Sequence, residues 1–191
     1  MTRAAHTHPA TILFVDHAPA LGGAERSLLL LFRYLDRTRW QAWLACAPGP
    51  LAEQARSLDI QVQVLPMPRL RRSLRFGYDW LAGVRRIARL ARSTGASAVV
   101  ANTVRAAWYA GPAARLAQLP FVWHMRDFWL GETRPRPEWI DSAGKRWLCS
   151  LSAQVIANSQ ATAACLPCPA KTSVIQPPPA TVAERQEECP A

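Results

Sequence analysis

Short apolar segments alternate along the chain with segments of helical periodicity, and this alternation limits the fold more than any other feature. The apolar segments predict strands at residues 11–15, 40–47, 60–66, 96–102, 120–125, 153–159 and 171–176. Between them apolar residues recur at helical spacing, as Leu28, Leu29 and Phe32 do. We expect Pro112 to kink or divide the helix over residues 104–119. Because strands that alternate with helices form parallel sheets covered on both faces, the sequence predicts a doubly wound α/β fold with about seven parallel strands.

The chain is expected to form one domain between two short flanks. Its 191 residues suffice for one full-sized domain and are too few for two large ones. This domain is expected over residues 11–176, after a flexible N-terminus at residues 1–10. From Pro177 the sequence reads PPPATVAERQEECPA, which is proline-led and polar. Residues 177–191 are therefore expected to be a linker or tail.

The sequence suggests neither a leader nor a membrane span. The N-terminal residues carry one basic residue and a four-residue apolar core before Asp16, which is short for a signal peptide. The longest aliphatic and aromatic run, from Leu28 to Phe32, has five residues, whereas a spanning helix needs roughly 20. We therefore expect a cytoplasmic protein that can be peripheral to the inner face of the membrane.

The cysteines are expected to be reduced thiols. There are five of them, an odd number without the density of a secreted disulfide scaffold: Cys46, Cys149, Cys165, Cys168 and Cys189. Cys165 and Cys168 form a CLPC sequence, but a zinc site needs a second pair of ligands and a redox motif needs a thioredoxin-like context. Metal or redox chemistry is not expected there.

Positive charge is concentrated in one segment. The formal net charge is +10, and Pro68 to Arg92 is rich in arginine while carrying one acidic residue, Asp79. Such a segment attracts anionic lipid or nucleic acid. The sequence contains no helix-turn-helix, zinc finger or RNA-binding aromatic motif, so nucleic acid is not an expected partner. A membrane surface and an ordinary solvated basic helix both remain open.

Parallel sheets of this class bind ligands beyond the carboxyl ends of their strands, and these ends carry polar residues. The candidates are the residues from Asp16 to Gly23, the pair Asn102 and Thr103, and the residues from His124 to Asp127. Ser159 follows a later strand and is expected to cap a short helix with its hydroxyl.

A glycine pair, Gly22 and Gly23, lies at the first strand-to-helix turn. Glycine lets a ligand approach the backbone closely, and the helix N-terminus offers N–H groups and a positive dipole to an anion. The spacing is neither the G-x-G-x-x-G of nicotinamide-binding proteins nor the G-x-x-x-x-G-K-[ST] of a P-loop. By itself the pair is more often simple turn chemistry.

Four stretches together resemble the N-terminal domain of the family 4 glycosyltransferases. In order they are LGGAERSLLLLFRYL, FVWHMRDF, AQVIANSQATAACL and KTSVIQPPP, and the resemblance covers roughly residues 11–179. It implies a Rossmann-like domain, the N-terminal half of a GT-B fold, in a retaining, metal-independent enzyme. Such an enzyme uses a nucleotide-sugar as co-substrate, with no other cofactor, and transfers the sugar to a glycan or lipid-linked acceptor.

The resemblance also implies roles for particular residues. Gly22 and Gly23 would approach the donor diphosphate, and Glu25 completes the G-G-x-E corner that is the most specific match. His124 would follow the fifth strand close to the transferred sugar, as a catalytic residue. A neutral imidazole there can hydrogen-bond a sugar hydroxyl or assist proton movement. Four residues are expected on the acceptor side: Asn102, Thr103, Arg126 and Asp127.

The resemblance implies that half of the enzyme lies beyond this sequence. Family members continue into a C-terminal donor domain, whereas here the corresponding place reads VIQPPPATVAERQEECPA. A departing diphosphate needs a metal ion or cationic side chains, and the first domain supplies no clear set. The isolated chain is therefore expected to be inactive without a donor-binding partner. The alternative is a non-catalytic basic domain that binds an anionic membrane surface or a partner protein.

Overall fold

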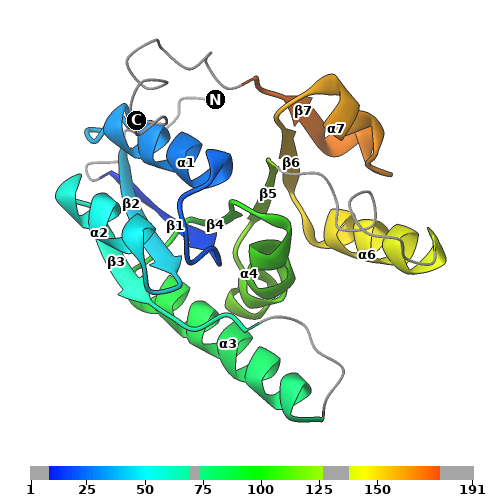
Figure 1. Cartoon of the computed structure of the whole chain (residues 1–191), viewed down its shortest axis with the longest axis horizontal. Helices are drawn as coiled ribbons and strands as arrows, with labels where there is room; N and C mark the ends of the chain where they lie inside the picture. The colour runs from blue at the N-terminus through cyan, green and yellow to red at the C-terminus, as the bar shows by residue number, and fades with distance from the viewer. Residues whose placement is uncertain (1–8, 69–73, 127–137, 177–191) are drawn as a thin grey trace, which may run out of the picture.

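The fold is given by a computed structural model that describes residues 9–68, 74–126 and 138–176 (Figure 1). The predicted N-terminal segment, apart from its last two residues, and the predicted tail lie outside this range. The described elements, in chain order, are β1 (Ala10–Asp16), α1 (Gly23–Arg33), β2 (Trp40–Cys46), α2 (Pro50–Ser57), β3 (Gln61–Val64), α3 (Leu74–Ser93), β4 (Ala98–Ala101), α4 (Val104–Ala117), β5 (Phe121–Met125), α6 (Glu138–Leu151), β6 (Gln154–Ala157), α7 (Gln160–Ala164), the 3-10 helix η1 (Pro169–Lys171) and β7 (Thr172–Val174).

The seven strands form one parallel sheet in the order β3-β2-β1-β4-β5-β6-β7. The predicted doubly wound sheet of about seven strands is therefore confirmed. The strand order reverses between β1 and β4, and in such sheets ligands bind beyond the carboxyl ends of the strands at this reversal. β1 ends at Asp16, and Asn102 follows β4 directly. The fold thus brings Asp16 and Asn102, two of the predicted strand-end residues, to the centre of the carboxyl edge of the sheet.

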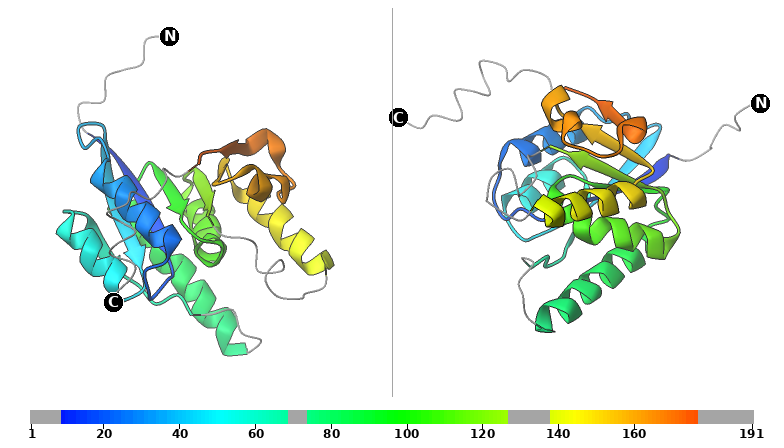
Figure 2. Two further views of the ribbon diagram at one scale, coloured as in Figure 1. Left: turned by 45° about the horizontal axis from the view of Figure 1, so that its top comes forward. Right: turned by 90° about the vertical axis from the view of Figure 1, so that its right-hand side faces the viewer.

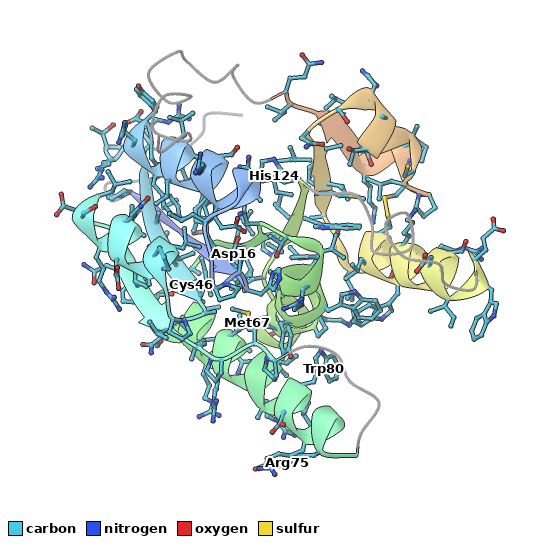
Figure 3. The ribbon with its side chains drawn as sticks, viewed as in Figure 1. Asp16, Cys46, Met67, Arg75, Trp80 and His124 are labelled. Carbon is cyan, nitrogen blue, oxygen red and sulfur yellow. A yellow bond between two sulfur atoms is a disulfide. The ribbon has the colours of Figure 1, made fainter. Side chains whose placement is uncertain are left out.

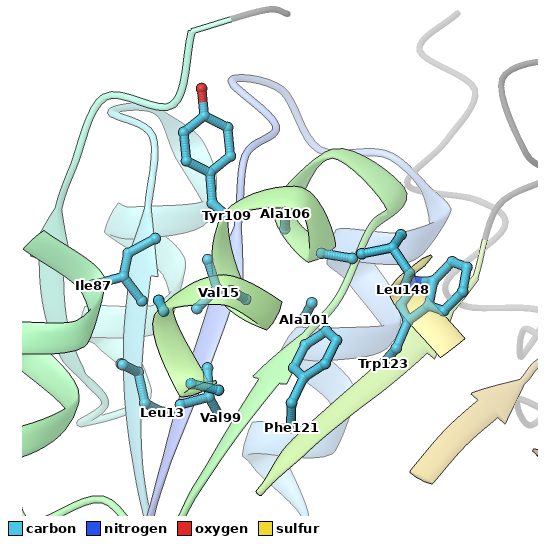
Figure 4. Packing of buried hydrophobic residues seen from close by; sticks show 14 of the residues in the cluster. Leu13, Val15, Ile87, Val99, Ala101, Ala106, Tyr109, Phe121, Trp123 and Leu148 are labelled. Carbon is cyan, nitrogen blue, oxygen red and sulfur yellow. The ribbon is translucent and has the colours of Figure 1, made fainter. Parts of the chain in front are cut away.

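Two hydrophobic clusters cover the two faces of the sheet. Leu13 and Val15 of β1 point into the larger cluster, which includes residues of α3, α4 and α6 (Figure 4). Phe14 points to the opposite face, where α1 and α2 pack and where its ring meets Phe32 edge-on at 5.1 Å. The alternation of side chains along β1 places one helical layer on each face (Figures 1 and 2). In Figure 2, α3, α4 and α6 lie side by side in one layer.

α4 runs through Pro112 as a single helix, so the predicted division of this helix is wrong. A proline cannot donate the bond to the carbonyl four residues earlier. Here that carbonyl belongs to Trp108, and it accepts a hydrogen bond from the indole N–H of Trp80 at 3.0 Å. The carbonyl is therefore satisfied from α3, and the helix continues.

The expectation of reduced cysteines is wrong for two of them. Cys149 at the end of α6 forms a disulfide with Cys168, 19 residues later, with the two Cα atoms 6.0 Å apart. Cys165, the other cysteine of the CLPC sequence, is not part of this disulfide. The spacing of the cysteines does not predict this pairing. The two residues meet because the chain leaves α6, passes through β6 and α7 and returns beside the end of α6.

The basic segment forms most of α3, the longest helix among the described residues. It begins at Leu74 and ends at Ser93. All five of its arginines have exposed side chains: Arg75, Arg85, Arg86, Arg89 and Arg92. None of the helices that the structure describes is both long enough and apolar enough to cross a membrane.

Candidate functional site

The glycine corner lies at the start of α1. Gly22 is the N-cap and has no side chain to accept from the first turn, while the Glu25 carboxylate accepts the Gly22 N–H at 2.8 Å. Glu25 is buried, with 4% of its surface exposed, so its carboxylate serves the corner itself. The first-turn amides of Gly23, Ala24 and Glu25 have no acceptor in the preceding turn of the helix. Their N–H groups and the helix dipole can bind an anion.

The two glycines of the corner differ in what surrounds them. A Cβ atom at Gly22 would lie 2.9 Å from Glu25 Oε2, so the carboxylate that accepts the Gly22 N–H would have to shift. A Cβ atom at Gly23 would meet nothing within 4 Å. Packing within the described residues therefore does not require Gly23, and the space beside it is open to a ligand.

A buried carboxylate and a buried side-chain amide lie at the centre of the carboxyl edge of the sheet. Asp16 at the end of β1 has no exposed surface, and Asn102 after β4 has 1% of its surface exposed. Asn102 Nδ2 donates to Asp16 Oδ2 at 2.6 Å and to the carbonyl oxygen of Ala24 at 3.2 Å. The backbone N–H of Ala18 donates to Asp16 Oδ1 at 2.8 Å. The sequence did not single out Asp16 within the strand-end residues, although it directly follows a predicted strand and is the last residue of β1.

Arg126 connects to this pair from the next strand. Its Nε donates to Asn102 Oδ1 at 2.7 Å, and its backbone carbonyl accepts from Asn158 Nδ2 at 2.6 Å. Thr162 in α7 donates in turn to Asn158 Oδ1 at 2.9 Å. A continuous set of hydrogen bonds therefore follows the ends of β1, β4, β5 and β6. Asn158 was missed by the sequence analysis, which placed it inside the strand predicted at residues 153–159, whereas it directly follows β6.

Two predicted capping or binding hydroxyls have local partners. Ser159 caps α7 by accepting the Thr162 N–H at 3.1 Å, which confirms that prediction. Thr103 caps α4 by accepting the Ala106 N–H at 3.3 Å, and its hydroxyl lies 2.6 Å from His17 Nδ1. Thr103 thereby holds His17 beside the start of α4. Its contact with an acceptor stays a prediction.

His124 lies inside β5 rather than after it, as its penultimate residue, so the predicted position is wrong by about two residues (Figure 3). The strand ends at Met125, which pairs with Ala157 of β6, and the strand predicted at residues 120–125 ends at the same residue. Burial, together with the positive charge of Arg126, lowers the pKa of His124 from its ordinary 6.5 to about 3. The imidazole is therefore neutral at pH 7, as a hydrogen-bonding role requires.

The remaining predicted features of the site divide between those that the structure describes and those that it does not. Asp127 lies outside the described residues. Among the described residues, no group of three or more histidine, cysteine or acidic side chains is placed to hold a metal ion.

Cys46 lies opposite Asp16 on β2, and burial, together with the Asp16 charge, raises the pKa of its thiol to about 11. Cys46 is therefore an unreactive thiol beside the site.

A central seven-stranded parallel sheet with helices on both faces, and a glycine corner after β1 where the strand order reverses, defines a Rossmann-like class of α/β domain. The model of Glycosyltransferase Family 4 matches residues 21–178, and the chain belongs to this family. Its fold is the N-terminal half of a GT-B glycosyltransferase. Among curated protein sequences, none matches the chain.

Solved structures show the same fold. HepE of Anabaena, in complex with UDP and glucose, is 25% identical with a TM-score of 0.66, over 87% of this chain and 44% of its own. A glycosyltransferase of Rickettsia africae is 18% identical with a TM-score of 0.68, over 95% of this chain and 48% of its own. MurG of Acinetobacter baumannii is 16% identical with a TM-score of 0.60, over 81% of this chain and 42% of its own. The chain thus spans less than half the length of these structures.

Proposed function

We propose that this chain is the acceptor-side domain of a GT-B glycosyltransferase, which transfers a sugar from a nucleotide-sugar to a glycan or lipid-linked acceptor. The observation that carries the proposal is the corner at Gly22 and Gly23, where first-turn amides border open space at the carboxyl edge of the sheet. The binding of UDP and glucose by HepE, which shares the fold at 25% identity, supports the same ligand class.

The residues around the corner have distinct parts in this proposal. The amides beside Gly22 and Gly23 hold the donor diphosphate. The neutral His124 hydrogen-bonds a hydroxyl of the transferred sugar, since its lowered pKa keeps it from carrying charge at pH 7. The acceptor side is formed by Asn102, Thr103, Arg126 and Asp127. Sugar transfer proceeds with retention, without a metal ion and without a cofactor other than the nucleotide-sugar.

Catalysis requires a second, donor-binding domain. The diphosphate that leaves carries charge that must be stabilised as the sugar departs, and the described residues around the corner supply backbone N–H groups rather than a cluster of cations. The matched structures are about twice as long as this chain. The chain alone is therefore inactive, and a donor domain in a longer protein or a separate subunit completes the site.

Donor consumption by the purified chain tests the proposal. Mass spectrometry would follow UDP- and GDP-sugars with and without lipid-phosphate acceptors, for the wild type and for His124→Ala. We expect binding of a nucleotide-sugar without turnover, and turnover once a donor domain is supplied. Turnover by the wild-type chain alone that is lost in His124→Ala would overturn the incompleteness of the site. A chain that binds no nucleotide-sugar would overturn the proposed function.

The uneven distribution of charge between the two helical layers favours a second role, binding to an anionic membrane surface. Helices α3, α4 and α6 together carry nine basic and three acidic residues, whereas α1 and α2 together carry three basic and two acidic residues. On α3, Tyr78 is 74% exposed and Leu81 36% exposed, among the arginines. Arg86, Arg89 and Arg92 also line a hollow of about 610 Å³ with Leu65 and Leu90 at its apolar side.

Arginine together with exposed aromatic and aliphatic side chains suits the headgroup region of an anionic bilayer. This layer would hold the chain at the inner face of the membrane, in the cytoplasm, where a lipid-linked acceptor is within reach. The same surface serves the alternative in which the chain is a non-catalytic membrane-binding or protein-binding domain. Nucleic acid is not a partner in either proposal.

A further inference from the structure

One side-chain amide joins three elements of the site. Asn102 donates from Nδ2 to Asp16 Oδ2 at 2.6 Å, at the end of β1, and to the carbonyl oxygen of Ala24 at 3.2 Å, in the first turn of α1. On its other side, Oδ1 accepts from Arg126 Nε at 2.7 Å. The glycine corner and Arg126 are therefore connected through a single buried residue.

Asp16 determines which end of this amide faces Arg126. An ionised carboxylate only accepts hydrogen bonds, and the guanidinium Nε–H only donates. If the amide were turned over, its oxygen would face the Asp16 carboxylate and its NH2 group would face the Arg126 Nε–H. Both contacts would be repulsive in a site with little exposed surface. The chemistry of its two neighbours therefore fixes the orientation of Asn102.

Arg126 is held at its backbone as well as at its side chain. Asn158 Nδ2 donates to the backbone carbonyl of Arg126 at 2.6 Å, while Thr162 donates to Asn158 Oδ1. A guanidinium group is planar, so a bond at Nε fixes the plane in which its terminal NH2 groups lie. The charge of Arg126 also acts on the imidazole of His124, which places it beside the proposed sugar-binding residue.

We propose that Asn102, oriented by Asp16, is a positioning residue that sets the guanidinium of Arg126 relative to the N-terminus of α1. The donor side of the site at Gly22 and Gly23 and the acceptor side at Arg126 then move as one unit. The identity of the two ligands rests on the proposed function, whereas the connection itself rests on the hydrogen bonds of Asn102.

Hydrogen exchange at Arg126 tests this directly and needs no ligand. The Nε–H signal of Arg126 is observed by ¹⁵N-edited NMR and assigned by its loss in Arg126→Lys. In the wild-type chain we expect a dispersed signal with slow exchange. In Asn102→Ala, loss of a hydrogen bond to a charged group should speed exchange by about tenfold or more. Fast exchange already in the wild type would overturn the proposal, even if Asn102→Ala does not fold.

An exchange of the two side chains serves as the matched rescue. Asn102→Asp alone places two carboxylates side by side and should lower stability. The double variant Asp16→Asn/Asn102→Asp restores one carboxylate and one amide, and Asp at position 102 can still accept from Arg126 Nε. We expect slow exchange at Arg126 to return in the double variant, with only the bond to the Ala24 carbonyl lost. Continued fast exchange in a folded double variant would overturn the positioning role.

A titration with UDP separates this inference from the proposed function. Binding at the corner should shift the Ala24 amide signal in the wild type and in Asn102→Ala. The Arg126 Nε–H signal should shift with it in the wild type and stay unchanged in Asn102→Ala. An equal shift of Arg126 in both would overturn the coupling. No shift of Ala24 in either would overturn nucleotide binding, while the exchange measurements would still decide the role of Asn102.

Discussion

The indole N–H of Trp80 in α3 donates to the carbonyl oxygen of Trp108 in α4 over 3.0 Å. In an unbroken helix this carbonyl would accept from the residue four positions later, which here is Pro112. The tryptophan of one helix thus replaces the donor that the proline of its neighbour lacks. The ring of Trp108 stacks on Trp147 of α6 with centroids 4.8 Å apart, so the three helices of this layer meet at one place.

Replacing Trp80 with phenylalanine should therefore leave the Trp108 carbonyl without its donor. We expect a loss of about 1–3 kcal/mol in the free energy of unfolding, measured by urea denaturation. Phenylalanine also changes packing, so the comparison is repeated in the Pro112→Ala background, where the helix supplies its own N–H. The loss should be smaller there. Equal losses in both backgrounds would show that packing, not the hydrogen bond, explains the effect.

His124 should make stability depend on pH in mildly acidic solution. Its pKa is about 3 in the folded chain because of burial and the Arg126 charge, against an ordinary value of 6.5. Below pH 6.5 the unfolded chain binds a proton that the folded chain does not, so stability falls as the pH falls towards 3. Between these values the slope is at most about 1.4 kcal/mol per pH unit.

Carboxylates also titrate in this range, so the informative quantity is the difference between the wild type and His124→Gln. The free energy of unfolding of the wild type should fall more steeply between pH 6.5 and pH 4.5 than that of the variant. Parallel curves would mean that His124 is already protonated in the folded chain or is solvated there.

The disulfide between Cys149 and Cys168 should stabilise the chain. Closing a loop with a sequence separation of 19 residues lowers the entropy of the unfolded state by an amount worth about 3 kcal/mol. We expect a loss of this size in the double variant Cys149→Ser/Cys168→Ser. Alkylation under non-reducing conditions followed by mass spectrometry should leave these two cysteines unmodified. Modification of both in the folded wild type would show that the bond is absent.

Binding to anionic vesicles should depend on the helical layer of α3. Arg85→Gln/Arg89→Gln should weaken binding to vesicles containing phosphatidylglycerol by about 30-fold, since each arginine near the surface contributes about 1 kcal/mol. The matched control is Arg33→Gln/Arg56→Gln, which removes the same charge from exposed positions of α1 and α2. Equal weakening by both pairs would show that net charge alone attracts the chain to the membrane.

The alternation of apolar segments predicted the sheet because each strand has its own local signal and the crossing connections follow from the class of fold. The Asn102 contacts could not be predicted in the same way. Asp16 and Asn102 are 86 positions apart, and only the strand order, with β1 beside β4, brings them together. Asp16 and Asn158 could have been found at the strand ends, but their partners depend on side-chain geometry that periodicity does not contain.

The same limit applies to the disulfide. Cys149 and Cys168 come together through the path of α6, β6 and α7, which leaves no pattern in the spacing of cysteines. For His124 the apolar pattern was the better guide, because the strand predicted at residues 120–125 contains it and ends at Met125 as β5 does, whereas the resemblance placed it after the strand. The glycine corner was accessible because a glycine pair between a strand and a helix has a local physical meaning.

The most direct test of the central claim is a titration of the ¹⁵N-labelled chain with UDP, followed at the amides of Gly23, Ala24 and Glu25. The space beside Gly23 is open, so Gly23→Ala should fold with unchanged or slightly raised stability while its methyl group obstructs a ligand at these amides. We predict saturable shifts centred on the first turn of α1 in the wild type and at least a tenfold loss of affinity in Gly23→Ala, for an obstructed amide contact to an anion. Shifts elsewhere, or equal affinity in both chains, would contradict the account of a diphosphate site at this corner.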